Sequence, residues 1–192
     1  MSNDETAYGP LKTFIGVWTG TGIDTVPDES GRPVSTGFFQ KLEFAAGPIL
    51  TYGKQTVRAL RYACEDLATD DAAHPSTFFP VYEENGYFVW VEEQRRVVLQ
   101  VSNPRGLSAL AVGSVDAEGV LRVSTEGASG ERGILVSGYF AQFSDITGYE
   151  AELSLQEPGT LHYSNCTRLR LPDGKPFRQT DVSTLRRYSG MQ

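Results

Sequence analysis

The stretch of sequence that most constrains the fold is Phe79–Gly113, in which short apolar segments alternate with polar turns. Phe88–Val91 and Val97–Val101 are rich in aromatic and β-branched residues, which favour strands. The polar run Glu92–Arg96 separates these two segments. The next break, Asn103–Gly106, combines a proline with a glycine that can adopt positive φ. The pattern predicts an antiparallel meander of three strands.

The rest of the chain repeats this pattern, with turn signals at even spacing and almost no helical periodicity. A chain of 192 residues fits one domain. We predict an all-β fold, a single up-and-down antiparallel β-barrel of about ten strands over residues 11–192, with little helix. Closure by the first and last strands would leave no open sheet edge. Residues 1–10 are expected to be disordered.

The predicted first strand, Gly16–Asp24, has glycines at alternate positions on the face that also carries Trp18. Missing side chains on one face let another backbone approach closely, as barrel strands require. We expect this strand to pair with Ser183–Tyr188, which would place arginines beside the indole in a cation–π contact. The residues assigned to this structural role are Trp18, Gly20, Gly22, Arg186 and Arg187.

The chain has a net charge of −7 at pH 7 and an isoelectric point near 4.9. Nucleic acids and anionic membranes favour clustered lysine and arginine, so neither is expected as a partner. Cys64 and Cys166 lack a metal-binding spacing, and we interpret them as free thiols, with a disulfide as the open alternative. The sequence shows no signal peptide and no apolar run near the roughly 20 residues that span a bilayer. We therefore expect a cytoplasmic protein.

Apolar residues occupy both faces of the first predicted strand of the meander. Tyr87, Val89 and Val91 alternate with Phe88 and Trp90, although a barrel wall needs only one apolar face. A helix or loop could cover the second face. The alternative is a homodimer contact, because exposed aromatic patches are commonly covered by partners.

The two histidines carry no recognisable catalytic pattern. His74 lies in an acidic loop, and His162 lies on a strand face with Ser164 and Cys166, which we expect to point outward. Neither has a serine, cysteine or aspartate partner at a readable spacing. We assign no catalytic residue and no metal ligand.

Several segments, in this order, resemble the nitrobindin-like heme-binding β-barrels, which share their calyx architecture with fatty-acid-binding proteins and lipocalins. The segments are GVWTGTG at Gly16–Gly22, LEFAAGPILTYGKQT at Leu42–Thr56, EENGYF at Glu83–Phe88, PRG at Pro104–Gly106, the hairpin after Gly113, and TLRR at Thr184–Arg187. The resemblance implies a barrel that encloses a small molecule.

The resemblance also implies heme as a cofactor, held in the family by a histidine. The matching position falls at Thr180 or Asp181, and a second family histidine position falls near Tyr82, beside Val81. The chain therefore resembles a family member without the proximal histidine. Tyrosine can bind ferric iron.

Alternation along the predicted strands also indicates which side chains face the interior. Phe38, Leu42 and Phe44 share a face, a long strand over Ile49–Tyr62 would add Tyr52, and Glu84 would face inward if Tyr82 does. With the positions from the family resemblance, the cavity candidates are Phe38, Leu42, Phe44, Tyr52, Val81, Tyr82, Glu84, Thr180 and Asp181.

We predict that the barrel binds a small, largely hydrophobic ligand. Two alternatives stay open. One is a heme protein with a non-standard iron ligand and nitrobindin-like chemistry on NO and peroxynitrite. The other is a cofactor-free isomerase or lyase with cavity acids and bases. A buried pair of a tyrosine with an aspartate or glutamate would favour the enzyme, and a wholly apolar cavity would count against it.

Overall fold

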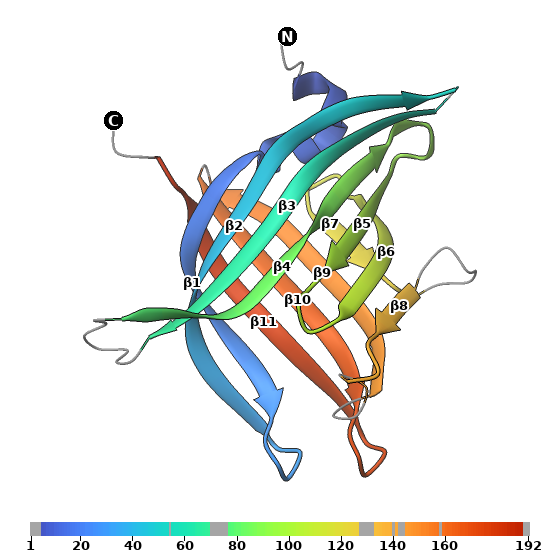
Figure 1. Cartoon of the computed structure of the whole chain (residues 1–192). Coiled ribbons are helices and arrows are strands. Elements are labelled where there is room, and N and C mark those ends of the chain that lie inside the picture. The colour runs from blue at the N-terminus through green and yellow to red at the C-terminus, as the bar shows by residue number, and fades with distance from the viewer. Residues whose placement is uncertain are drawn as a thin grey trace.

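The computed structural model describes residues 5–53, 55–69, 77–126, 133–139, 141, 145–157 and 159–189. Strands dominate this part of the chain (Figure 1). The elements are η1 (Glu5–Phe14), β1 (Gly16–Pro27), β2 (Pro33–Tyr52), β3 (Gln55–Thr69), β4 (Phe78–Val91), η2 (Glu92–Gln94), β5 (Arg96–Ser102), β6 (Leu107–Val115), β7 (Leu121–Ser124), β8 (Gly133–Val136), β9 (Asp145–Glu157), β10 (Thr160–Arg170) and β11 (Pro176–Arg187).

The strands form a closed antiparallel barrel. Strands β1 to β7 pair in sequence order, β7 pairs with β9, and β9, β10 and β11 lead back to β1. The short strand β8 adds to β6 outside this ring. Ten strands therefore close the barrel, which confirms the predicted fold class.

Closure depends on the pairing of β1 with β11. Trp18–Thr25 run antiparallel to Thr180–Arg187, with Trp18 opposite Arg187. The Arg187 guanidinium carbon lies 4.3 Å from the centre of the Trp18 ring, and the indole nitrogen donates a 2.8 Å hydrogen bond to the carbonyl of Phe14. The predicted cation–π contact is present and is made by Arg187.

The glycines of β1 permit this close pairing. A Cβ atom at Gly20 would overlap the carbonyl oxygen of Thr184 on β11. A Cβ atom at Gly22 would overlap the side chains of Ser183 and Phe38. Both positions therefore require glycine because neighbouring strands occupy the space of a side chain.

One end of the barrel is filled by apolar side chains and covered by η1 (Figure 1). Tyr8, Leu11 and Phe14 are all buried: Leu11 and Phe14 are three residues apart on one side of a 3-10 helix, and Tyr8 precedes the kink at Gly9. The ring of Phe14 packs on Phe44, which in turn contacts Phe88, with centroids 6.1 and 5.7 Å apart. This end of the barrel is a packed hydrophobic core.

The structure differs from the sequence expectation at the N-terminus. We expected disorder over residues 1–10, but η1 begins at Glu5 and the hydroxyl of Tyr8 donates a hydrogen bond to the carbonyl of Gly47. Residues 1–4 lie outside the described residues. The buried side of η1 accounts for the difference, since the barrel end would otherwise expose its apolar core.

A second difference concerns the segment predicted as one strand over Ile49–Tyr62. Gly53 has φ of 61° and ends β2, so β3 begins at Gln55 and pairs back on β2. The register also shifts between Ala46 and Ile49. Tyr52 consequently lies beside the hairpin turn with 66% of its surface exposed, so it does not line the interior.

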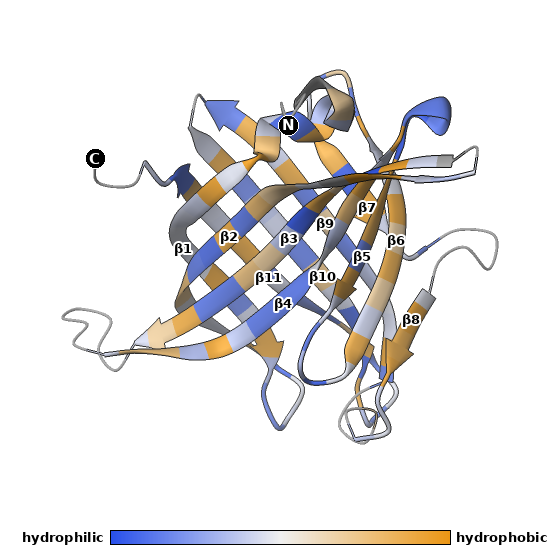
Figure 2. Ribbon diagram, turned by 45° about the horizontal axis from the view of Figure 1, so that its top comes forward, coloured by the Kyte–Doolittle hydropathy of each residue, from blue (hydrophilic) through white to orange (hydrophobic). Residues whose placement is uncertain are grey.

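The strands alternate hydrophobic and hydrophilic residues along their length (Figure 2). Phe88 and Trp90 lie on the inner side, where Phe88 is buried and Trp90 packs against Gly9 of η1, while Tyr87 is exposed. The barrel and η1 thus cover the inner aromatic residues. A homodimer through the outer face stays a prediction.

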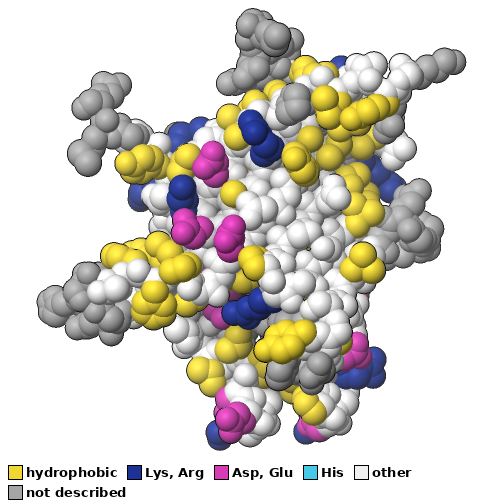
Figure 3. Space-filling view, in the orientation of Figure 1, with side chains coloured by type: hydrophobic (Ala, Val, Ile, Leu, Met, Phe, Trp, Pro, Cys, Tyr) yellow, Lys and Arg dark blue, Asp and Glu magenta, His cyan; other side chains and the backbone are white. Residues whose placement is uncertain are grey.

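The outer surface mixes charges of both signs on the face drawn in Figure 3. Cys64 and Cys166 are free thiols, as predicted. Among the described residues, no helix is long and apolar enough to cross a membrane.

Candidate functional site

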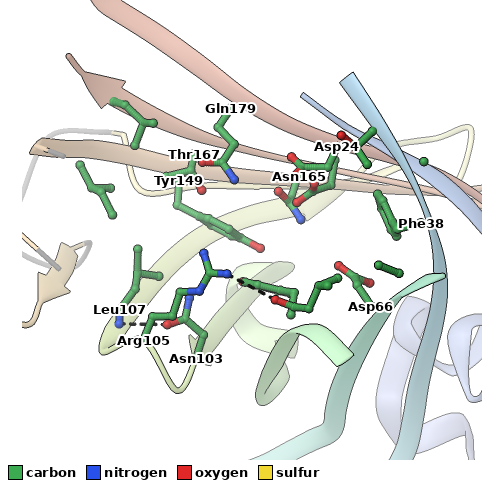
Figure 4. A pocket seen from close by; sticks show the side chains of 18 residues that line it. Asp24, Phe38, Asp66, Asn103, Arg105, Leu107, Tyr149, Asn165, Thr167 and Gln179 are labelled. Atoms are coloured by element: carbon green, nitrogen blue, oxygen red, sulfur yellow. Dashed lines mark hydrogen bonds between the residues drawn. The ribbon is translucent and has the colours of Figure 1, made fainter. Parts of the chain in front are cut away.

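A cavity of about 280 Å³ lies inside the barrel, away from the end that η1 covers (Figure 4). Its wall combines apolar and polar side chains from strands on all sides of the barrel. The apolar residues are Phe38, Ala68, Val81, Leu107, Ile146 and Leu169, and the polar residues are Asp24, Thr36, Asp66, Tyr82, Asn103, Arg105, Tyr149, Asn165, Thr167, Gln179 and Asp181.

Two carboxyl groups meet where β1 and β11 close the barrel. Asp24 is directly opposite Asp181 in the strand register, and both side chains line the cavity, so each carboxyl group affects the pKa of the other. Burial and the neighbouring Asp24 charge raise the pKa of Asp181 to about 8, and burial also raises the pKa of Asp24. Near neutral pH the pair therefore holds one proton, as two adjacent carboxyl groups commonly do.

A third carboxyl group, Asp66, faces the cavity from β3 and is 5% exposed. The Gln40 amide donates a 2.8 Å hydrogen bond to it, and the Cys64 thiol lies 3.5 Å away. Burial raises the pKa of Asp66 to about 6, since the amide hydrogen bond only partly compensates for lost hydration.

Glu84 lies directly behind the cavity wall and is 1% exposed. Its two oxygens accept hydrogen bonds of 3.0 Å from Tyr62 and 2.7 Å from Tyr82. The Tyr62 hydroxyl also lies 3.1 Å from that of Tyr163, to which Asn165 donates. Burial raises the pKa of Glu84 to about 7, so this carboxyl is half protonated near neutral pH. The inward orientation expected for Glu84 is present.

Two polar atoms at this site have no hydrogen-bond partner. Tyr149 is 2% exposed, and its hydroxyl, which has Glu84 and Tyr163 as neighbours, points into the cavity (Figure 4). The Oδ1 atom of Asp24 is also buried and unpartnered.

Arg105 is exposed at the rim and donates a 3.3 Å hydrogen bond to the carbonyl of Val81.

The structure places the predicted cavity residues in different surroundings. Phe38, Val81, Tyr82 and Asp181 line the cavity, and Glu84 contacts Tyr82 behind the wall. The remaining candidates lie elsewhere, namely Leu42 and Phe44 in the packed core and Tyr52 at the β2–β3 hairpin.

Thr180 does not line the cavity either. It faces a groove on the outer side of β7, β9, β10 and β11, with Cys166 and Val182. The reason is the alternation of a strand, since Asp181 faces inward and its neighbours must therefore face outward.

Sequence reasoning missed Asp24, Asp66, Arg105, Tyr149 and Asn165. Each comes from a different strand or turn, and only the barrel register brings them together. Alternation was the one available signal. Asp24 continues the face that carries Trp18, Gly20 and Gly22, and that pattern could have placed it inside.

The histidines do not contribute to this site in the described part of the chain. His162 is half-buried on β10, with its Nδ1 atom 3.3 Å from the Thr184 hydroxyl, away from the cavity lining. His74 lies outside the described residues. Across the described ranges, no three His, Cys, Asp or Glu side chains are arranged to hold a metal ion.

A closed antiparallel barrel with an interior cavity is the architecture of small-molecule-binding calyx proteins. Residues 7–187 match the model of the THAP4-like, heme-binding beta-barrel domain, and the chain belongs to this family. The crystal structure of Rv2717c from M. tuberculosis is similar, with a TM-score of 0.66 and 21% identity over 98% of this chain and 99% of that chain.

The S-type phycobiliprotein lyase CPES from Guillardia theta is a second similar structure. Its TM-score is 0.52 and its identity 11%, over 92% of this chain and 89% of that chain. At these identities both structures share the barrel fold alone. No curated protein matches the chain.

The residues around the cavity do not fit the iron of heme. The cavity lining contains no histidine, and the side chains that could act as iron ligands are the phenols of Tyr82 and Tyr149. Burial raises the pKa of both phenols well above the usual range, which disfavours the tyrosinate that would bind iron. The position matched to the family histidine falls at Thr180, which faces away from the cavity, or at Asp181, whose carboxyl lies beside that of Asp24.

We predict that Glu84→Gln makes protein stability less dependent on pH. The pKa of Glu84 rises from its ordinary 4.5 to about 7 in the folded protein. Between these values the unfolded chain releases a proton that the folded protein retains. The free energy of unfolding of the wild type should therefore fall by about 3 kcal/mol as the pH rises through this range. Glutamine does not ionise, so the variant should lose this part of the slope.

Urea unfolding at a series of pH values measures the effect. Glu83→Gln is the matched control, because Glu83 is exposed on the opposite face of β4. Asp66 and Asp181 contribute slopes of the same sign and stay in both variants. Equal slopes for the wild type and Glu84→Gln would contradict the prediction.

Proposed function

We propose that this protein binds a small amphipathic molecule in the barrel cavity. The observation that carries the proposal is the Tyr149 hydroxyl, which is buried, unpartnered and directed into the cavity. A buried polar group without a partner costs about 1–3 kcal/mol. A ligand that bonds to this hydroxyl would recover that cost, which a barrel built for stability alone would avoid with an apolar residue.

The lining modifies the expected ligand. The sequence predicted a largely hydrophobic molecule, and Phe38, Leu107 and Ile146 offer an apolar wall for such a body. Carboxyl, amide and phenol groups, including Asp66 and Asn165, are interspersed among these apolar side chains. A ligand that suits this mixed lining has an apolar body and a polar end.

A small aromatic probe tests the proposal. We expect indole to change the amide chemical shifts of Phe38, Leu107 and Tyr149 in a ¹⁵N–¹H spectrum, because it fits a cavity of this size. Ala68→Phe should abolish the changes, since Ala68 lines the cavity and phenylalanine would fill part of it. Ala117→Phe is the matched control in the exposed turn between β6 and β7. Shift changes confined to the outer strands, or unaltered binding by Ala68→Phe, would contradict the proposal.

Hemin provides the second test. We expect one equivalent of protein to leave the Soret band of hemin in its free position, because no cavity side chain is a suitable iron ligand. Asp181→His is the matched variant, since it places an imidazole where the family resemblance assigns the iron ligand. A shift in this variant alone would attribute the lack of heme binding to the missing ligand. A sharp shift with the wild type would support the heme alternative.

Acid–base catalysis is the second candidate function. The pKa values of Asp66 and Asp181 are raised to about 6 and about 8, so near neutral pH the first can accept a proton and the second can donate one. The hydrogen-bonded pair Tyr82–Glu84 is the kind of buried pair that favours an isomerase or lyase over a passive binding protein.

Proton exchange at phenylacetone in D₂O, followed by NMR, measures this activity. If these groups catalyse proton transfer, the exchange rate should rise through about pH 6 and fall through about pH 8, and Asp66→Asn should abolish it. If the protein causes no exchange across this pH range, it does not catalyse proton transfer at carbonyl compounds of this kind.

A further inference from the structure

The inference concerns the polar end of the ligand and rests on the proposed binding function. We propose that the cavity recognises an organic cation, a primary ammonium group on an apolar body, which binds between Asp24, Asp181 and Tyr149.

The hydrogen-bonding capacity of the site matches an ammonium group, which has three N–H donors and no acceptor. Asp24 offers a buried oxygen with no partner, and Asp181 offers a second carboxyl group beside it. The Tyr149 hydroxyl adds an unpartnered oxygen that can accept the third bond. The lining of the cavity therefore supplies three acceptors.

The charges of the cavity lining also favour a cationic ligand. Asp24 and Asp181 lie directly across from each other on paired strands, where two like charges are unfavourable. Asp66 adds a third acidic group to the same cavity. The one cationic side chain in the lining, Arg105, is exposed at the rim and is bonded to a backbone carbonyl. The Arg105 charge lowers the pKa of Asp24, but a cation inside the cavity would compensate these half-buried carboxylates more effectively than the exposed guanidinium.

The apolar side chains of the lining favour an organic cation over a metal ion. Phe38, Leu107, Ile146 and Leu169 provide apolar contacts that a hydrated metal ion cannot use. Their side chains leave room for an aromatic or short aliphatic body next to the carboxyl pair.

Binding of a cation here should displace the proton that the carboxyl pair shares. The O–H bond of Asp181 breaks, the proton passes to the buffer, and the ammonium group forms hydrogen bonds to the resulting carboxylates. Charge balances because one cation enters as one proton leaves. The titratable or charged groups that face the pair are Asp66 from β3, Tyr82 from β4, Arg105 from the β5–β6 turn and Tyr149 from β9; the lining residues of β2 and β10 add none.

The experiment compares three probes of similar shape by isothermal titration calorimetry with the full chain. They are 2-phenylethylammonium, neutral 2-phenylethanol and anionic 3-phenylpropanoate. We expect the ammonium to bind about tenfold or more tightly than the other two. Titrations in buffers of different ionisation enthalpy should show release of up to about one proton at pH 7, and the affinity should rise toward pH 9 as the pair loses its proton.

Three variants test whether the carboxyl pair and Tyr149 bind the ammonium group. Asp181→Asn should reduce the preference for the ammonium over the alcohol and eliminate proton release, while Tyr149→Phe should weaken ammonium binding alone. Asp173→Asn, in an exposed turn, is the control. Since the comparison of probes uses the wild type, it does not depend on whether the variants fold.

Each outcome has a distinct consequence. Equal or tighter binding of the alcohol or the carboxylate overturns the cation inference and leaves the proposed cavity binding in place. Failure of all three probes while indole binds also overturns the cation inference alone. Failure of indole as well contradicts the proposed function. Displacement of the ammonium by lower concentrations of Ca²⁺ or Zn²⁺ would assign the carboxyl groups to a metal ion and overturn the inference.

Discussion

The pairing of β1 with β11 is the contact on which the rest of this structure depends. It joins the first and last strands of the barrel and removes the open edges of the sheet, and alternating glycines in β1 allow the strands to come together. Near one end it sets the Trp18 indole against Arg187, and near the other it sets Asp24 against Asp181. The register of this one strand pair, the β1–β11 seam, therefore places both a contact that stabilises the barrel and the carboxyl pair of the cavity.

The interior divides into three levels along the barrel axis. Aromatic and aliphatic side chains fill the end under η1, the Glu84 network of phenols follows, and the mixed cavity comes last. The middle level is costly because a carboxyl group without water must be satisfied by the protein. Tyr62 and Tyr82 satisfy it with two hydrogen bonds. Such a network supports the cavity side chains from behind and holds Tyr82 in place.

Much of the fold could be predicted from local patterns, because turns and alternation are properties of neighbouring residues. The meander, the glycine strand with its cation–π contact, and the inward Glu84 all follow from period-two alternation. The prediction that Tyr52 lines the cavity was wrong, because Gly53 ends the strand there and the chain forms a hairpin. The cavity carboxyl groups Asp24 and Asp66 could not be identified together, since each is a single residue on its own strand and the pairing register alone unites them.

The position of the carboxyl pair on the seam has a consequence for how the protein matures. Asp24 lies near the start of the chain and Asp181 near its end, so their contact has the largest sequence separation of any in the site. During synthesis, most of the sheet can assemble before the last strand leaves the ribosome, but the pair cannot. The carboxyl pair therefore forms only after β11 has joined β1, as the last step in closing the barrel.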